Sequence, residues 1–573
     1  MTAVRWRRWA LVGLAAIAAA YAVRVALWRP FDVQGPDPLD GLPRATGVVH
    51  VHTTLSDGGG TPQEVAAAAR SAGLGFVAIT DHNNVDAKAF EGYHDGVLVL
   101  VGTEISTTAG HVLGLGVADP AYRFSGGAQD ALDDVASLGG AAFAAHPLSP
   151  RADFQWTGWD LPGPWGVELW NGDSQWREAG WLRLARTAGV YGLNRRYALL
   201  GSLSAPTAAL ARWDGLLATR AASGIVGADA HSRAPVTKKL APRFPSYESL
   251  FALARNHVVL EQPLRGDAAA DARAIVDALA RGRSYAAVDA LASADGFSFV
   301  AKGEQGRAVI GETIAPQGGL RLRVGGRMPR GTRVVILKDG QPVAEDVDGV
   351  EAAGTPGVYR AEAYVPGWSI PWVVTNPIYV FDEAAAARRA AAARVREEPP
   401  APAAAQVIDA FDGTTGFAPG SDSSTEQNRD VIDAKGGTAG SGAARIAFRL
   451  GVPTPGHADV FAALVDRTPR DLSGREGLTL AIRGDGVYRI WVQVRDANPA
   501  SRDGGTEWWF ASVRTSPEWR RVALPFERLR SINPNTDGKL NLDQVRELVF
   551  VLDKGSLKPG TSGTIWIDDL AVY

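Results

Sequence analysis

At 573 residues the chain is too long for one hydrophobic core, and its length predicts about four domains. Lys and Arg number 59 against 62 Asp and Glu, and this net charge of −3 gives no reason to expect a nucleic-acid partner. Cysteine is absent, which excludes disulfides and thiolate ligands, so a metal site would have to use His, Asp and Glu. Only 9 His occur, and their positions are therefore informative.

An apolar run near the N-terminus predicts a membrane anchor. Residues 9–28 form a run of 20, interrupted only by Arg24, that follows arginines at positions 5, 7 and 8. This length is enough for one spanning helix, and the preceding basic residues favour a cytoplasmic N-terminus. We therefore expect residues 1–30 to be a single-pass anchor in a bacterial inner membrane, with the bulk of the protein periplasmic. The alternative is a signal peptide cleaved near residues 20–22, which would release a secreted protein.

From about residue 44 to 295, apolar runs alternate with helical patterns. Expected strands cover residues 47–51, 76–80, 97–101, 112–116, 141–144, 166–170 and 225–226, and expected helices cover residues 62–70 and 129–138. The first helix has a distinct start, because Thr61, Pro62 and Glu64 supply an N-cap, a first-turn proline and a capping-box partner. Strands that alternate with helices predict a parallel sheet, here closed into an α/β barrel.

Residues able to bind a metal stand at or just past the ends of these strands. His50 and His52 would share one face at the end of the first strand. The others are Asp57, His82, Glu104, His111, His146, Asp229 and His231. Each motif alone is equally compatible with a salt bridge, a turn or a packed loop. Seven of the 9 His precede residue 232, however, and all but His94, in a polar loop, follow or flank apolar strands. Because the carboxyl ends of barrel strands meet at one rim, we expect these side chains to converge.

Together these motifs resemble a known metallohydrolase superfamily. His50-x-His52, Asp57, Thr80–Asp81–His82, Glu104, His111, His146–Pro147 and Asp229-x-His231 look like the motif set of the PHP (polymerase and histidinol phosphatase) superfamily. Residues 282–285, 294–297 and 371–380 further resemble its carbaryl-hydrolase-like (CehA/McbA) branch. The resemblance implies a PHP-type distorted (β/α)7 barrel over residues 44–295, holding two to three divalent metal ions.

The resemblance also assigns the ligands to individual ions. One ion would take His50, His52, Glu104 and Asp229; a second would share Glu104 and add His111 and His146; a third would take Asp57, His82 and His231. Imidazole and carboxylate ligands suit Zn, Mn or Fe. Metal-bound water would be the nucleophile. Asp81 would either orient His82 or its neighbours, or cap the following turn.

A tryptophan-rich stretch separates His146 from Asp229. Seven of the 17 Trp fall in it, at positions 156, 159, 165, 170, 176, 181 and 213. They predict either an aromatic wall at the mouth of the site or rings that pack loops onto the barrel or meet a membrane interface. Asn171, after an expected strand, could face substrate. Arg195 could bind a phosphate together with Arg196, or be an ordinary surface charge.

The rest of the chain predicts β-structure. Residues 296–381 resemble a small antiparallel β-sandwich, residues 382–405 a linker, and residues 406–573 a larger β-sandwich or jelly roll. The last of these resembles galactose-binding-like domains of the carbohydrate-binding (CBM) and CIA30 kinds. That resemblance implies possible glycan binding, and a structural Ca ion with Asp409, Asp412 and Asp568 as candidate ligands. Trp508 and Trp509 could stack on a sugar, although strand alternation places one of them in the core. A folded spacer is the alternative.

These features predict a divalent-metal-dependent hydrolase of a small-molecule ester, anchored in a membrane through the N-terminal helix. A phosphoesterase is the first choice, because clustered divalent ions suit phosphoryl transfer. Hydrolysis of a carbamate or carboxylic ester is the second, following the branch that the sequence resembles. A non-catalytic envelope carbohydrate-binding protein is an alternative of a different class.

Overall fold

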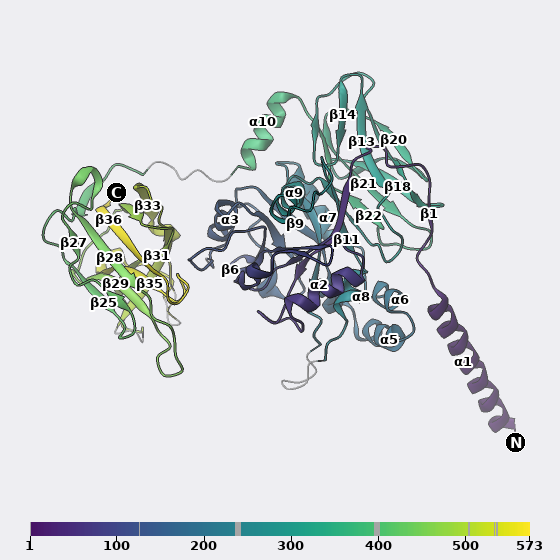
Figure 1. Cartoon of the computed structure of the whole chain (residues 1–573), viewed down its shortest axis with the longest axis horizontal. Helices are drawn as coiled ribbons and strands as arrows, with labels where there is room; N and C mark the ends of the chain where they lie inside the picture. The colour runs from purple at the N-terminus through teal and green to yellow at the C-terminus, as the bar shows by residue number, and fades with distance from the viewer. Residues whose placement is uncertain are drawn as a thin grey trace. The chain divides into compact units, whose positions relative to one another are not determined.

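The computed structural model describes residues 2–124, 126–234, 242–394, 401–501, 505–531, 533 and 537–573, with side chains from residue 9 onward. The chain divides into two compact units (Figure 1). Met1–Ala118 and Gly126–Arg396 form the first, and Asp119–Ser125 and Glu397–Tyr573 form the second. Each unit is described by itself below.

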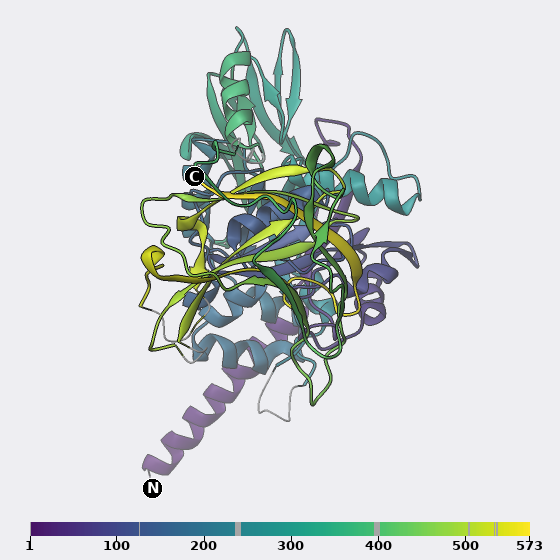
Figure 2. The ribbon, with the colours of Figure 1, turned by 90° about the vertical axis from the view of Figure 1, so that its left-hand side faces the viewer.

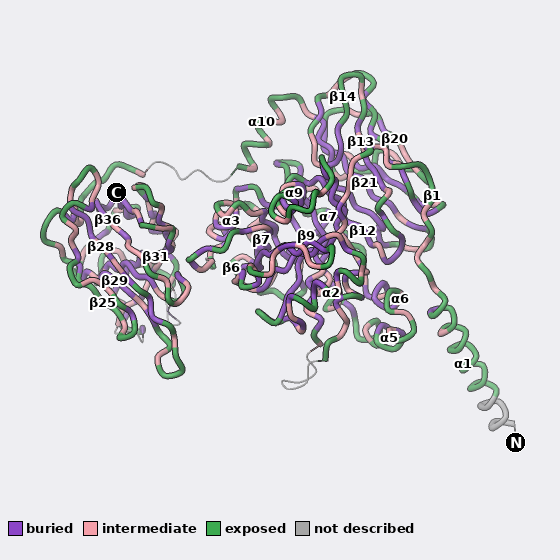
Figure 3. The backbone as a smooth tube through the Cα atoms, viewed as in Figure 1, coloured by how far each residue is buried: buried purple, intermediate pink, exposed green. Residues whose placement is uncertain are grey.

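The first unit begins with helix α1, Thr2–Leu27. Its segment Trp9–Leu27 is the one stretch of the described chain that is long and apolar enough to cross a membrane. Figure 3 shows the described side chains of this helix, from Trp9 on, almost entirely exposed, in contrast to the buried strands of the barrel. An isolated apolar helix of this length is compatible with a membrane span or a signal sequence, the two possibilities that the sequence predicts.

Strand β2, Arg44–Val51, is one of the strands that form the wall of the closed barrel. It pairs in parallel with β3, Phe76–Ile79, on one side and with β10, Gly224–Ala230, on the other. The ring continues from β3 to β5, Val97–Val101, and from β10 through β9, Trp165–Asn171, to β8, Ala141–Ala145. Apart from Arg44, Thr46 and Ala228 these strands are buried, as expected where a parallel sheet is covered on both faces.

The remaining part of the ring corrects the prediction of a wholly parallel sheet. Strands β6, Thr103–Thr107, and β7, Gly110–Leu115, form an antiparallel hairpin, and β7 also pairs antiparallel with β8. A parallel connection needs about a dozen residues or more, and only two residues separate β6 from β7. Gly110, at φ +102°, makes the tight turn possible. The hairpin brings Glu104 and His111 into the same site from neighbouring strands.

Helices cover the outside of the ring. Helix α2, Pro62–Ser71, has the predicted capping box between Thr61 and Glu64. The other helices of this unit are α3 Ala128–Ser137, α4 Gly172–Glu178, α5 Trp181–Tyr191, α6 Arg195–Leu200, α7 Thr207–Leu217, α8 Tyr247–Phe251, α9 Ala268–Ala280 and α10 Glu383–Ala392. Helix α10 lies in the predicted linker, of which residues 395–400 are outside the described part.

The small sandwich shares a sheet with the barrel. Strand β11, Arg255–Val259, pairs with the first half of β2, and β12, Ser284–Ala287, pairs with both β11 and β22, Val373–Thr375. That sheet also includes β15 Thr313–Ile314, β18 Arg333–Lys338, β19 Gln341–Val347, β21 Gly357–Tyr364 and β23 Ile378–Val380, and β4 Gly92–His94 pairs with β5. The facing sheet consists of β14 Gly306–Val309, β13 Phe297–Gly303, β16 Arg321–Gly326 and β20 Val350–Ala353. Strands β1, Val33–Gln34, and β17, Met328–Pro329, form a separate pair.

The second unit is the β-sandwich that the sequence predicts. Figure 2 shows its strands, green to yellow, facing the viewer. One sheet contains β24 Gln406–Asp409, β26 Glu426–Gln427, β27 Ile432–Asp433, β28 Ala443–Arg449, β30 Gly477–Gly484, β33 Arg520–Pro525 and β36 Ser562–Val572. The other contains β25 Phe417–Ser421, β29 Phe461–Asp466, β31 Arg489–Ala497, β32 Thr506–Arg514, β34 Arg530–Ser531 and β35 Val545–Asp553. Buried rings of Phe411, Phe417 and Phe550 pack in its core.

Asn376 ties the end of the shared sheet to the barrel. This buried side chain accepts a hydrogen bond from Gly224 N (2.7 Å) and donates to Gly224 O (2.8 Å) and Ser284 O (2.8 Å). Replacing Asn376 by Ala should lower the free energy of unfolding by about 2–5 kcal/mol, because buried backbone groups lose their partners. Urea denaturation followed by tryptophan fluorescence measures this change. The exposed Gln341→Ala variant should stay within about 0.5 kcal/mol of the parent, and an equally small effect of Asn376→Ala would contradict this role.

Candidate metal centre

The buried carboxylate of Glu104 is surrounded by five imidazoles. Its Oε2 lies 3.2 Å from His50 Nε2, 3.1 Å from His52 Nε2 and 3.2 Å from His82 Nδ1. Its Oε1 lies 2.7 Å from both His111 Nδ1 and His146 Nε2. These side chains come from the carboxyl ends of β2, β3 and β8 and from the β6–β7 hairpin, so the strand ends converge as the sequence predicts.

Two further carboxylates join the cluster. Asp229 Oδ1 lies 3.4 Å from His52 Nε2, 3.5 Å from His50 Nε2 and 3.4 Å from His231 Nδ1. Asp57 Oδ1 lies 3.2 Å from His231 Nε2, and 3.7 and 3.8 Å from ring nitrogens of His52 and His82. All nine residues that the sequence proposes as metal ligands are thus in one cluster.

Three groups in the described chain have ligand atoms within 4.8 Å of one another and could hold a metal ion. They are His50, His52, Glu104 and Asp229; His52, Asp57, His82 and His231; and His82, Glu104 and His111. The first has the membership that the resemblance assigns. The second adds His52 to the assigned set, and the third has His82 in place of His146. His146, although outside these groups, still contacts Glu104 at 2.7 Å.

The backbone at the site departs from regular strand geometry. His50 has φ +64°, Asp229 φ +46° and His146 φ +29°, values that residues other than glycine rarely adopt. The register of β2 shifts against both β3 and β10 near His50. Simple alternation along a strand is therefore not what aligns His50 with His52, although both Nε2 atoms still reach Glu104 Oε2. Strained backbone of this kind is often found at functional sites.

Five buried atoms of the cluster have no hydrogen-bond partner. They are Nε2 of His50 and of His52, Nδ1 of His82 and of His146, and Oδ1 of Asp229. A buried polar atom without a partner is unfavourable. Imidazole nitrogens and carboxylate oxygens are ligands for Zn, Mn and Fe, so the residues present fit divalent ions.

The charges in the cluster shift each other's pKa values. Burial acts to lower the pKa of His50, but Asp229, Glu168 and Glu104 outweigh it and raise that pKa well above its ordinary value. Burial acts to raise the pKa of Glu104, but the surrounding histidines hold it well below its usual range. Burial acts to lower the pKa values of His146 and His231, but neighbouring carboxylates outweigh it and raise them to about 9. In the metal-free site, protonated imidazoles therefore balance the buried carboxylates.

Glu168 is the functional residue that sequence reasoning missed. It is fully buried on β9, where Oε1 lies 2.8 Å from His50 Nδ1 and Oε2 accepts from His146 N (2.5 Å). This carboxylate fixes the orientation of His50 and leaves Nε2 facing the cluster. The signal in the sequence is a single acidic residue within an apolar strand, between Val167 and Leu169.

Asn171 and Asp81 hold residues of the cluster, or the loop beside it, in place through hydrogen bonds. Asn171 Nδ2 donates to Glu168 Oε2 (2.9 Å) and to Asp229 Oδ2 (3.0 Å), and its Oδ1 caps α4, so the side chain is already engaged. Asp81 accepts from Thr53 N (2.8 Å), Thr53 Oγ1 (2.7 Å) and Ser56 Oγ (2.5 Å). The structure thus pairs Asp81 with the loop after His52, which it stabilises.

Arg195 is placed away from the cluster. It is exposed on α6, with its guanidinium 5.9 Å from the centre of the Tyr191 ring. The tryptophans divide between the two predicted roles: Trp156, Trp165 and Trp213 are buried in the core, whereas Trp170 and Trp176 line a cavity beside Asp229 and His231.

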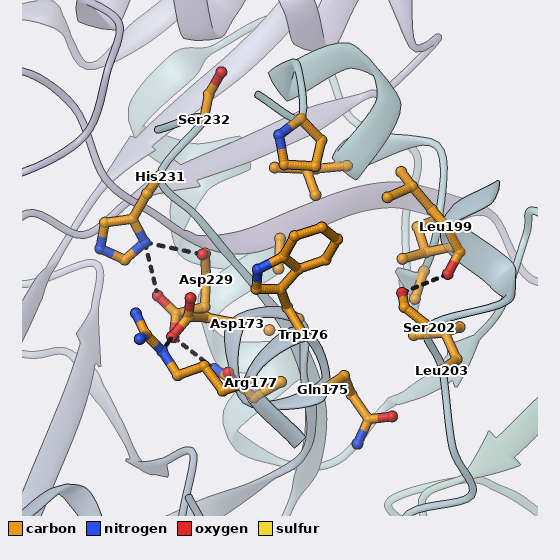
Figure 4. Close-up of a pocket in the computed structure, with 18 of the residues that line it drawn as sticks. Asp173, Gln175, Trp176, Arg177, Leu199, Ser202, Leu203, Asp229, His231 and Ser232 are labelled. Carbon is orange, nitrogen blue, oxygen red and sulfur yellow. Dashed lines mark hydrogen bonds and ion pairs between the residues drawn. The ribbon is translucent and has the colours of Figure 1, made fainter. Parts of the chain in front are cut away.

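Figure 4 shows this cavity, which has a volume of about 330 Å³. Its walls are largely apolar, formed by Trp170, Trp176, Leu199, Leu203, Val226, Phe244, Pro245, Leu250 and Leu253. Asp229, His231, Asp173 and Arg177 lie at one end, where Arg177 forms an ion pair with Asp173. The buried Nε1 of Trp170 has no hydrogen-bond partner. An organic molecule could thus lie against the apolar walls with a polar group at the cluster.

The carboxylates proposed for calcium have other partners. Asp409 accepts from Phe411 N and Thr415 Oγ1, Asp412 from Gly442 N, and Asp568 from Thr438 N and Oγ1. Across the described residues, the groups that could hold a metal all lie in the first unit. Trp509 is buried, as alternation predicts for one of the pair, and Trp508 lies beneath the Arg495 guanidinium at 3.8 Å.

Comparison with known proteins assigns the C-terminal part of the chain. Residues 394–573 match the carbohydrate binding domain of family 11. Among solved structures, a family 11 carbohydrate-binding module of Clostridium thermocellum is 19% identical, with a TM-score of 0.24, and the match covers 29% of this chain and 94% of that one. A Bacteroides vulgatus two-domain protein, described as containing a predicted PHP-like metal-dependent phosphoesterase, is 16% identical with a TM-score of 0.28. That match covers 61% of this chain and 99% of the other.

The fold and the site thus define a barrel protein with a buried His/Asp/Glu cluster and a C-terminal family 11 carbohydrate-binding domain. A curated relative is the uncharacterized protein MJ1587 of Methanocaldococcus jannaschii, 32% identical over an alignment of 117 residues, with a coverage of 18% of this chain and 67% of that protein. With this identity over two thirds of its length, the chain belongs to the family of MJ1587.

Metal-free protein should lose stability as the pH rises from about 6.5 to 9. His146 and His231 have pKa values of about 9 when folded, above the ordinary value of 6.5, so their contribution is complete below pH 6.5 and disappears as they deprotonate. Thermal melts of chelator-treated protein across this range measure the effect. Added Mn²⁺ should raise the midpoint more at pH 9 than at pH 6.5, because ligands must be deprotonated to bind. The reverse order would contradict metal binding by these histidines.

Gly227→Ala should weaken metal binding without a substitution at any proposed ligand. A Cβ at Gly227 would lie 1.4 Å from Glu168 Oε1, so this carboxylate must move away from His50. Loss of such a partner typically lowers metal affinity about 10- to 100-fold, measurable by competition with a chromophoric chelator. Gly215→Ala, in helix α7 with open space at its Cβ, is the matched control and should leave affinity unchanged. Equal affinities for the two variants would rule out this role of Glu168.

Proposed function

We propose that this chain is a divalent-metal-dependent hydrolase of the PHP type and that its substrate is a phosphoester. The observation that carries the proposal is the convergence on Glu104 of five imidazoles, several with unpartnered buried nitrogens. Three of these nitrogens lie 3.1–3.2 Å from the same oxygen of Glu104 without forming a hydrogen bond, an arrangement that an ion bound between them would satisfy. The sequence resemblance to the PHP motif set supports the same assignment, and Zn, Mn or Fe are the ions that these ligands suit.

The proposed ligands divide among ions that share residues. His50, His52, Glu104 and Asp229 would hold one; Asp57, His82 and His231 a second; and Glu104, His111 and His146 a third. When bound, such ions supply an activated water at neutral pH and offset negative charge on the phosphoryl oxygens.

The protein's own residues prepare the site. Glu168 accepts from His50 Nδ1–H and so directs Nε2 toward the ion. Asn171 holds one oxygen of Asp229 and leaves Oδ1 facing the cluster. Arg177, paired with Asp173 at the same end of the cavity, is a cation in position to orient phosphoryl oxygens. The apolar cavity walls support a substrate with an apolar group on its ester oxygen.

The test joins metal content with activity. Elemental analysis of the purified full-length protein should find Zn, Mn or Fe, and the protein should hydrolyse a nitrophenyl phosphate ester faster than an aryl N-methylcarbamate. The double variant His50→Ala with His52→Ala should lose bound metal and at least about 100-fold in activity, since ligands matter more than the groups that orient them. His94→Ala, whose ring stacks on Phe90 outside the cluster, should retain both. Faster carbamate turnover would move the assignment to the carbaryl-hydrolase-like branch, and full activity without metal would overturn it.

A second function is favoured by the match of residues 394–573 to a carbohydrate-binding domain: we propose that the second unit binds a polysaccharide. On β31 and β32, side chains that alternate with the buried core residues place Trp491 and Phe510 on the outer face, with ring centres 5.2 Å apart. Aromatic rings of this kind can stack on sugar rings.

Affinity electrophoresis of the full-length protein through a panel of β-glucans tests this function. Trp491→Ala should reduce retardation at least about twofold, since a stacked aromatic ring contributes about 0.5–1.5 kcal/mol. Trp566→Ala, a half-buried tryptophan on the opposite sheet, is the matched control and should behave as the parent. Absence of retardation by every glucan would leave the domain with the role of a folded spacer.

A further inference from the structure

The α5–α6 hairpin, residues 181–200, presents large apolar side chains to solvent. Trp181 is 75% exposed, Leu182 66% and Leu193 48%. Trp181 and Leu182 begin α5, and Leu193 stands in the turn before α6. Exposed apolar residues that lie singly need no explanation, but these three occur within thirteen residues of one hairpin. A hairpin that exposes large apolar side chains at both ends of α5 is a candidate interaction surface.

The charge of the hairpin indicates an anionic partner. Residues 179–203 contain four arginines and no Asp, Glu or Lys. All four, Arg183, Arg186, Arg195 and Arg196, are exposed. Arg196 also lines a cavity of about 510 Å³ together with Arg29, the second residue after α1, and with Arg255, Asp32 and Asp289. Exposed arginines thus lie along the hairpin, and further arginines line the cavity that leads to the end of that helix.

The hairpin packs on the last turns of α1. Val25 is fully buried against Val190 and Ala198. Asn194 Nδ2 donates to the backbone oxygens of Val25 (3.1 Å) and Trp28 (3.0 Å), and Arg186 Nε donates to Tyr21 Oη (2.8 Å). Tyr21 and Val25 belong to the apolar stretch Trp9–Leu27. The hairpin is therefore held level with the end of the segment that could cross a membrane, and Figure 1 shows α5 and α6 on the side of the barrel where α1 leaves it.

We propose that the α5–α6 hairpin docks in the interfacial layer of an anionic phospholipid bilayer, the one that α1 enters. Trp181, Leu182 and Leu193 would enter the boundary between headgroups and acyl chains, where tryptophan is enriched. The four arginines would contact lipid phosphates. The proposal rests on α1 as a membrane anchor and is independent of the hydrolase assignment. Because only Ala179 and Gly180 separate α4 from α5, docking also keeps the Trp176 and Arg177 side of the cavity close to the lipid.

A single-label experiment tests the docking surface, because the chain contains no cysteine. Leu182→Cys in the full-length protein is labelled with an environment-sensitive dye and reconstituted in phosphatidylcholine vesicles with 30% phosphatidylglycerol. Val343→Cys, at a site 49% exposed on β19 of the same unit, is the matched control. Lipids carrying a quencher on the upper acyl chain should quench the Leu182 label at least threefold more than the Val343 label. Adding Arg183→Glu and Arg195→Glu should remove most of that difference.

Each result bears on the proposal. Equal quenching at the two positions would overturn it, as would a dye that is shielded from water yet unaffected by quencher lipids, which would indicate a second protein copy on this face. Flotation of the same vesicles is a separate readout of α1: protein that does not float lacks the anchor, and the proposal fails with it. Floating protein with equal quenching shows instead that α1 is embedded while the hairpin stays in water. Metal content and hydrolysis, measured in parallel, are not altered by either outcome.

Discussion

The structure of the first unit depends on the burial of the Glu104 carboxylate. Such a group is stable away from water only when positive charge or hydrogen-bond donors compensate its lost hydration. Here the compensation comes from five imidazoles on four segments of the barrel, so the carboxylate and the strand ends hold each other in place. In the metal-free state protons on the imidazoles provide the positive charge, and divalent ions can replace those protons. Protons and divalent ions therefore compete for the same site.

Bringing these groups together strains the backbone. His50, His146 and Asp229 all have positive φ, and the strand register shifts around His50. The surrounding structure offsets that strain: Glu168 accepts from the backbone N–H of His146, and the absent side chain at Gly227 leaves the space that Glu168 occupies. Closure of the barrel through β2, β3 and β10 then fixes the strand ends that carry the ligands.

Much of this arrangement can be predicted from the sequence where the determinants are local. Apolar runs followed by His or Asp give the ends of β2, β3 and β10, and Thr61 with Glu64 gives the start of α2. The β6–β7 hairpin could have been found from the short distance between Glu104 and His111, which leaves no room for a helix. The pairing of β11 with β2 could not, because it joins segments about 200 residues apart and nothing in either segment specifies the partner. Glu168 was missed for a related reason: only the position of His50 in space shows what a carboxylate within β9 is for.

The sequence predicts metal ions in the barrel and in the C-terminal sandwich, and these two places differ in whether the ligand oxygens and nitrogens already accept hydrogen bonds. In the barrel, Asp229 Oδ1 and the facing nitrogens of His50 and His52 form no hydrogen bond, so an ion adds interactions that the protein lacks. In the sandwich, one oxygen of Asp568 already accepts from the amide and hydroxyl of Thr438 and from the hydroxyl of Ser441. A carboxylate that is satisfied in this way stabilises its loop through protein donors, and an ion would have to displace them. Asp229 and Asp568 carry the same carboxylate but have different roles. Asp568 is satisfied by protein donors, whereas Asp229 keeps an oxygen available for an ion.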